Sequence, residues 1–122
     1  MIEFLPVSQE ERDKLYEANG VPAEAASMGV RLKDRGMNEG YCLFTLLGDI
    51  CRIDRFHMDT EDALLADGLL RACCSLALNR GGEQAFSEYT EDFPLLLSLG
   101  FIKSGEKVYL NMAKLLKSCA CH

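Results

Sequence analysis

The sequence predicts an α+β domain, an α/β-type sandwich in which helices cover both faces of a mixed, mostly antiparallel central sheet. Two observations predict it. Short apolar segments with strand-like spacing follow one another in the middle of the chain, and a long segment with apolar residues at helical spacing comes directly after them. No linker, repeat or low-complexity stretch interrupts the 122 residues. We therefore expect a single domain over residues 1–122, with a cysteine-rich tail at 118–122.

The first elements are a strand and a helix. The apolar segment Ile2–Val7 predicts a short strand, which Pro6 and Ser8 end. Ser8 is a typical N-cap, and Glu11 three residues later completes a capping box. The helix that follows is expected to end near Gly20-Val21-Pro22.

Three strand-like segments come next. Met28–Lys33 alternates apolar with small or polar residues, and residues 35–40 are predicted as a turn or loop. Tyr41–Leu47 is almost continuously apolar, which predicts a central strand covered on both faces. Gly48-Asp49 separates it from Ile50–Met58 by two residues, the spacing of a tight hairpin.

The last of these strands changes phase partway along. Cys51 and Ile53 belong to one alternation, whereas Phe56 and Met58 belong to the other. One extra residue near Asp54-Arg55 reconciles the two, because a β-bulge inserts a single residue into one strand of a pair. A bulge is therefore predicted at this point.

A long helix is predicted after the hairpin. Thr60 is its expected N-cap, with Glu61 and Asp62 in the first turn, where carboxylates favour the positive end of the helix dipole. Two apolar stripes indicate burial over much of the helix surface, with Leu65, Leu69, Cys73 and Leu76 in one and Leu70, Cys74 and Ala77 in the other. Arg80-Gly81-Gly82 is expected to end it.

The remaining elements are short. A strand is predicted over Glu83–Tyr89 and a helix over Phe93–Leu99, in which Pro94 is tolerated in the first turn. Strands are predicted over 101–103 and 107–112, and a short helix or extension over 113–118.

Charge and hydropathy exclude two kinds of partner. Lys and Arg total 13 against 19 Asp and Glu, so the net charge is −6, and an acidic chain repels nucleic acid. No apolar run approaches the ~20 residues that span a bilayer. The first six residues are neither basic nor a long apolar run, so no signal peptide is recognised. We expect a cytoplasmic protein that binds neither nucleic acid nor membrane.

The order of elements resembles that of the GCN5-related N-acetyltransferase (GNAT) superfamily over nearly the whole chain. The phase shift between Ile53 and Phe56 lies where that family has a bulged fourth strand. Gly68-Leu69-Leu70-Arg71-Ala72 and Asn79-Arg80-Gly81 resemble the helix after it, and Leu96-Leu97-Ser98-Leu99-Gly100-Phe101 resembles the late Tyr-x-x-x-Gly-Phe segment.

The resemblance implies a cofactor and a ligand. Acetyl-CoA would lie in a cleft beside the bulged strand, in contact with Phe56, Met58 and Ala66. A small-molecule or peptide ligand would share that cleft, and members of the family often form homodimers. If the protein is an enzyme, the resemblance makes it an acyl-CoA-dependent N-acetyltransferase.

The segment matching the family's phosphate loop departs from the family pattern. That pattern, Gln/Arg-x-x-Gly-x-Gly/Ala, lets backbone N–H groups approach the pyrophosphate. Here it aligns with residues 61–66, where Glu61 replaces the basic or amide residue, Leu64 replaces the first glycine, and only Ala66 fits. Glu61, Asp62 and Asp67 add negative charge where a polyanion would bind. The loop therefore disfavours acetyl-CoA.

The catalytic groups also differ. Acetyl transfer needs a base for the amine and an acid for the leaving thiolate, and Leu96 occupies the position of the family's proton-donating Tyr. Asp54, His57 and Glu88 are the candidate catalytic residues; the alternatives are ordinary surface charges for Asp54 and Glu88 and a polar strand end for His57. We expect the chain to lack standard acetyl-CoA-dependent activity.

Six cysteines leave a second hypothesis open. Cys42, Cys51, Cys73 and Cys74 are predicted as small core residues. Cys119, Cys121 and His122 form a Cys-x-Cys-His group whose ligands suit zinc, although a chain end that carries thiols by chance explains them as well. The alternatives to a GNAT-like function are thus a metal- or thiol-handling protein and a non-catalytic dimeric interaction module.

Overall fold

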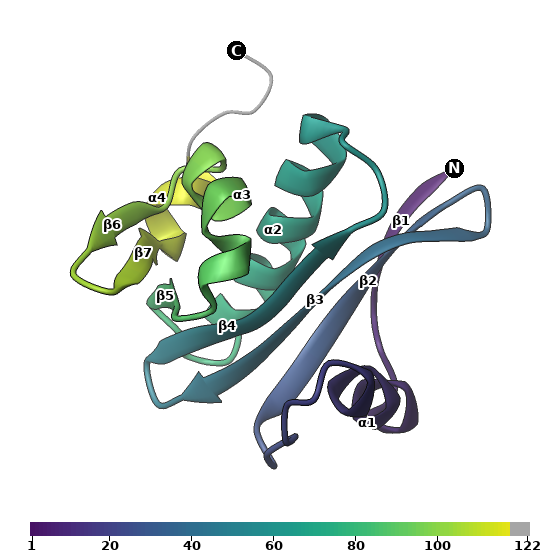
Figure 1. The fold of residues 1–122 in the computed structure, drawn as a ribbon, viewed down its shortest axis with the longest axis horizontal. Helices are drawn as coiled ribbons and strands as arrows, with labels where there is room; N and C mark the ends of the chain where they lie inside the picture. Colours follow the sequence, from purple (N-terminus) through teal and green to yellow (C-terminus); the bar gives the residue numbers. More distant parts are fainter. Residues whose placement is uncertain (118–122) are drawn as a thin grey trace.

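A computed structural model describes residues 1–117 and contains one seven-stranded sheet (Figure 1). The strands are β1 (Ile2–Pro6), β2 (Ser27–Asp34), β3 (Met37–Leu47), β4 (Ile50–Met58), β5 (Gln84–Ser87), β6 (Ile102–Ser104) and β7 (Lys107–Asn111). They lie in the order β1-β2-β3-β4-β5-β7-β6, and only β4 and β5 are parallel neighbours. The predicted mixed, mostly antiparallel sheet is confirmed.

Helices cover both faces of this sheet, as predicted (Figure 1). Helix α1 (Gln9–Ala18) packs against β2 and β3 on one face. The other face carries α2 (Ala63–Leu78), α3 (Phe93–Ser98) and α4 (Met112–Lys117), with the 3₁₀ turn η1 (Thr90–Asp92) leading into α3. No helix within residues 1–117 is long and apolar enough to cross a membrane.

The predicted start of α1 and the predicted bulge in β4 are both confirmed. Ser8 Oγ accepts a hydrogen bond from the Glu11 N–H at 3.1 Å, so Ser8 caps α1. In the β3–β4 pair, Leu43 lies opposite Arg55 and Phe44 lies opposite Ile53, which leaves Asp54 as the extra residue. The change of phase along the sequence therefore has the expected cause.

The predicted loop over residues 35–40 is wrong. Only Arg35 and Gly36 form the turn, both with positive φ (55° and 80°), and β3 already begins at Met37. Met37 pairs with Asp34, and its side chain is 66% exposed. Because this end of the strand buries little apolar surface, its sequence carries no strand-like alternation.

The predicted N-cap of α2 is also wrong. Asp62 rather than Thr60 caps the helix, because its Oδ1 accepts hydrogen bonds from the N–H groups of Leu64 (2.9 Å) and Leu65 (3.2 Å). Thr60 Oγ1 instead accepts from the Asp62 N–H at 3.3 Å, in a turn before the helix. Glu61 therefore precedes the helix and does not lie in its first turn.

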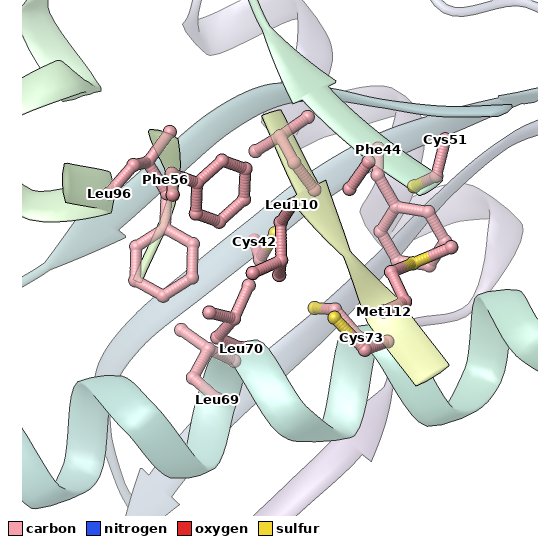
Figure 2. Close-up of a cluster of buried hydrophobic side chains, with 14 of the residues drawn as sticks. Cys42, Phe44, Cys51, Phe56, Leu69, Leu70, Cys73, Leu96, Leu110 and Met112 are labelled. Carbon is pink, nitrogen blue, oxygen red and sulfur yellow. The ribbon is translucent and has the colours of Figure 1, made fainter. Parts of the chain in front are cut away.

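The hydrophobic core lies between the sheet and α2. Figure 2 shows Leu69, Leu70 and Cys73 of α2 beneath Cys42 and Phe44 of β3. The two predicted apolar stripes are confirmed, since Leu69, Leu70, Cys73, Cys74 and Ala77 are buried. Cys42 and Cys51 are buried as well, so all four cysteines predicted for the core lie in it.

Candidate functional site

The candidate site lies where β4 and β5 separate. The two strands pair only from Ile50 to Arg52, opposite Gln84 to Phe86. Within residues 1–117, no strand pairs with that edge of β4 from residue 53 onward. A backbone donor on such an edge needs another partner. The Phe56 N–H finds one in the Asp92 carboxylate, to which it donates a hydrogen bond at 2.8 Å.

A second contact fixes the same segment to β4. The Arg55 guanidinium carbon lies 3.5 Å from the centroid of the Tyr89 ring, which is a close cation–π contact. The Tyr89 hydroxyl donates to Glu91 Oε2 at 2.6 Å. We call residues 89–92 the strap, since they cross from the end of β5 to the separated part of β4.

The Asp92 carboxylate lies in an environment that resists its charge. Burial raises its pKa, while the hydrogen bond from the Phe56 N–H and the charge of Arg55 lower it. Glu91 raises the pKa further, and His57 lowers it. The net direction is upward, so desolvation outweighs the favourable partners.

The N-terminus of α2 carries a second internal carboxylate. Asp62 Oδ1 accepts from the two amides that the resemblance would direct at phosphate, those of Leu64 and Leu65. Leu64 itself is 81% exposed, at the position of the family's first glycine. Ala66 is buried in the core beneath the helix and does not border the open side of the loop.

Asp54, a candidate base, lies in a buried network on the α1 side of the sheet. Its carboxylate accepts hydrogen bonds from the Tyr16 hydroxyl (2.6 Å), the Thr45 hydroxyl (2.7 Å) and Arg52 Nε (2.6 Å). Burial and the bond to Asp54 raise the pKa of Tyr16. Asp54 is 6% exposed, so the alternative of an exposed charged pair is wrong. All three donors come from this chain, which leaves the carboxylate fully engaged.

His57 and Glu88 have different partners from those of Asp54. His57 Nε2 is 2.7 Å from Asp59 Oδ1, and its ring stacks on Tyr41 with centroids 5.0 Å apart. Glu88 is exposed beyond β5, with Lys107 Nζ at 3.9 Å. No hydrogen bond or ion pair joins any two of the three candidates in the described part of the chain. Their catalytic role therefore stays a prediction.

The other predicted ligands have different surroundings. The side chain of Phe56 is buried in the core, and that of Met58 packs against the core at its edge. Leu96, at the position of the family's Tyr, is completely buried (0% exposed). Within residues 1–117, no group of three or more His, Cys, Asp or Glu side chains can hold a metal ion. Cys119, Cys121 and His122 lie outside the described residues, so the zinc site stays a prediction.

Cavities occur elsewhere on the surface. Five of them, with volumes from about 270 to about 460 Å³, are distributed over the described chain, and none of the five is lined by Phe56, Met58 or Ala66.

Asp92 was not anticipated from the sequence. Its contact with Phe56 spans 36 residues and depends on how the strap returns to β4, for which no local pattern exists.

Comparisons with known proteins identify the fold. No family model and no curated protein matches the sequence. Among solved structures, the ribosomal-protein-S18-alanine N-acetyltransferase of Escherichia coli is similar, with a TM-score of 0.70 at 12% identity over 92% of this chain and 94% of that one. A GNAT-family acetyltransferase of Staphylococcus aureus Mu50 gives a TM-score of 0.68 at 9% identity over 92% and 99%.

A third structure contains the cofactor. The PaiA N-acetyltransferase of Thermoplasma acidophilum, in complex with coenzyme A, gives a TM-score of 0.63 at 12% identity over 89% of this chain and 96% of that one. At these identities the likeness shows the fold alone. The order of elements, the bulged β4, the separation of β4 from β5 and the three structures agree: this chain has the fold of the GNAT acetyltransferases.

Proposed function

We propose that this protein is a diverged GNAT-fold protein that binds a small molecule or peptide and does not carry out standard acetyl-CoA-dependent transfer. One observation carries the proposal. Two groups of backbone donors in the candidate cleft, the first amides of α2 and the Phe56 amide, are both occupied by carboxylates of the chain itself. Asp62 occupies the first group, and Asp92 occupies the second.

The electrostatics of the α2 N-terminus support this proposal. A phosphate placed there would displace Asp62 and lie close to its charge and that of Glu61. Two like charges 4 Å apart repel by about 4 kcal/mol at an effective dielectric constant of 20, before salt screens them. A pyrophosphate brings more than one charge, so the penalty exceeds what the helix dipole contributes, typically 0.3–1 kcal/mol.

The chemistry of the cleft points in the same direction. General acid catalysis of thiolate departure needs a proton donor within hydrogen-bond reach. Leu96 has no proton to donate, and Asp54 has three donors already bound. If the protein does transfer an acyl group, we expect N-acetyl transfer in which the catalytic acid and base occupy positions other than those of the family's pattern.

A thermal-shift measurement tests the proposal. A ligand present at a hundred times its dissociation constant stabilises the folded state by about 2.7 kcal/mol, which raises Tm by several degrees. We expect the same Tm with and without 1 mM coenzyme A or acetyl-CoA (roughly the concentration needed to detect ligands of 10 μM affinity). A rise of several degrees in the wild-type protein would contradict the proposal.

A homodimeric interaction module is a second candidate, which one surface favours. On the face of the sheet that bears α1, the register places Phe86, Tyr109 and Ile102 in one row across β5, β7 and β6. Ile102 is 72% exposed and Tyr109 is 37% exposed. Paired apolar faces of this kind suit an isologous dimer.

Light scattering tests this second candidate. If the row forms the interface, wild-type protein elutes as a dimer and Ile102→Glu converts it into a monomer. Leu64→Glu is the matched control, because Leu64 is an equally exposed apolar residue far from the row in sequence. A wild-type monomer at all concentrations would remove the dimeric candidate.

A further inference from the structure

The Phe56 amide is an edge donor with an unusual occupant. Where β4 loses β5 as its partner, the donor is satisfied by the side chain of Asp92, which lies 36 residues away in sequence. A buried or half-buried N–H needs an acceptor, so the hydrogen bond itself is expected. A charged carboxylate in that role is not required, because a backbone carbonyl or a hydroxyl would satisfy the N–H without bringing a charge into a half-buried place.

The strap that delivers this carboxylate is held at both ends. The Tyr89 N–H donates to the buried Ser87 Oγ at 3.2 Å, its ring stacks with Arg55, and the Asp92 N–H donates to the Tyr89 carbonyl oxygen at 3.0 Å. Thr90 and Glu91 between them are exposed. Burial raises the pKa of Asp92 in spite of the Phe56 bond, so the ionised carboxylate is held at a net cost.

The charges around the carboxylate define what else can bind there. Arg55 and His57, both on β4, favour a negative charge at Asp92, while Glu91 on η1 opposes it. Without the Asp92 carboxylate, the Phe56 N–H would lack its acceptor. Arg55, held by the Tyr89 ring and by its bond to the Asp54 carbonyl oxygen at 2.6 Å, would still supply positive charge nearby.

We propose that the Phe56 amide and the neighbouring Arg55 form a subsite for a small organic carboxylate, which Asp92 occupies from within the chain. The proposal rests on the proposed function, in which this cleft holds a ligand other than acetyl-CoA. It names the chemistry of that ligand, since the structure contains a carboxylate at this position.

Hydrogen exchange of the Phe56 amide, measured by NMR with acetate as the probe, tests this proposal. Asp92→Ala is expected to accelerate exchange of that amide roughly tenfold, because a hydrogen bond to a charged group is lost. Acetate at 100 mM (about the level suited to a millimolar carboxylate site) should then slow the exchange again, whereas chloride at the same ionic strength should not. Glu91→Gln is the matched control, since it removes the same charge from the same strap and leaves the Phe56 bond in place.

Two results would overturn the proposal: an unchanged Phe56 exchange rate in Asp92→Ala, or acceleration that acetate and chloride affect equally. If Asp92→Ala does not fold, Asp92→Asn serves the same comparison, because its neutral amide oxygen is a poorer acceptor; acetate should slow Phe56 exchange in it as well. Failure of the proposed function is seen separately, as binding of acetyl-CoA to the wild-type protein.

Discussion

The Asp92 carboxylate accepts a hydrogen bond from the Phe56 N–H at 2.8 Å, at the point where β4 and β5 part. It occupies, from within the chain, one amide on the edge of β4 that the GNAT-like resemblance assigns to a cofactor. Asp62 occupies the first amides of α2 in the same manner. These two carboxylates and their partners lead to predictions that separate the role of each.

The N-cap of α2 is predicted to depend on Asp62. Asp62→Ala leaves the Leu64 and Leu65 amides without their acceptor, so it should lower the free energy of unfolding by about 1 kcal/mol. Urea denaturation measures this loss. Asp62→Asn should retain most of the stability, and Thr60→Ala should change it little. A larger loss in Thr60→Ala than in Asp62→Ala would show that the cap is assigned to the wrong residue.

The buried network around Asp54 is predicted to be structural. Asp54→Ala leaves the Tyr16 hydroxyl and Arg52 without their shared acceptor, which should lower the free energy of unfolding by roughly 3 kcal/mol. His57→Ala, which removes an exposed side chain from the same strand, should cost under about 0.5 kcal/mol. Chemical denaturation measures the free energy of unfolding of both variants. Equal decreases in the two would mean that the network around Asp54 contributes little to stability.

The sequence predicted the bulge but not the contacts that the bulge organises. Ile53 and Phe56 each lie on a strand with one well-buried face, so their alternation could be read locally and its break located. Thr60 and Asp62 are both residue types that commonly cap helices, so the sequence alone does not choose between them. The choice depends on the path of the turn before the helix. The meeting of Asp92 with Phe56 depends on tertiary structure alone.

Stability should depend on pH through Asp92. Its pKa is raised in the folded state, so the folded protein binds the proton more tightly than the unfolded chain does. The stability that this group contributes is therefore present below the ordinary value of 3.8 and lost as pH rises through the raised pKa. The measurement is the urea midpoint of the wild type and of Asp92→Asn between pH 3 and 7, about the span over which a raised carboxyl titrates. The difference between the two midpoints at each pH reports the contribution of Asp92 to stability.

Because other carboxylates titrate in the same range, the difference between the two proteins is the relevant quantity. The stability of Asp92→Asn relative to that of the wild type should increase as pH rises. Glu91→Gln is the control on the same turn. A difference that stays flat with pH, or that shrinks, would show that the pKa of Asp92 is not raised.

The core cysteines are predicted to be unreactive. Cys42, Cys51, Cys73 and Cys74 are buried, and burial raises the pKa of each thiol, to about 12 for Cys74. Thiolate is the reactive form, so iodoacetamide at pH 8 should label none of them in the folded protein. Mass spectrometry of a variant with Cys119→Ser and Cys121→Ser should find no label before urea and four labels after it. Labelling of the folded variant would contradict this burial.

Isothermal titration of the wild-type protein with acetyl-CoA shows whether the chain binds this cofactor. If Asp62 and Asp92 occupy the donors that the cofactor would need, the titration should give no saturable heat at ligand concentrations up to about 1 mM. The Asp62→Ser variant, which keeps a cap and removes the charge, provides the comparison for the phosphate end of the cleft. One-to-one binding of acetyl-CoA to the wild type with micromolar affinity would show that Asp62 and Asp92 do not exclude the cofactor.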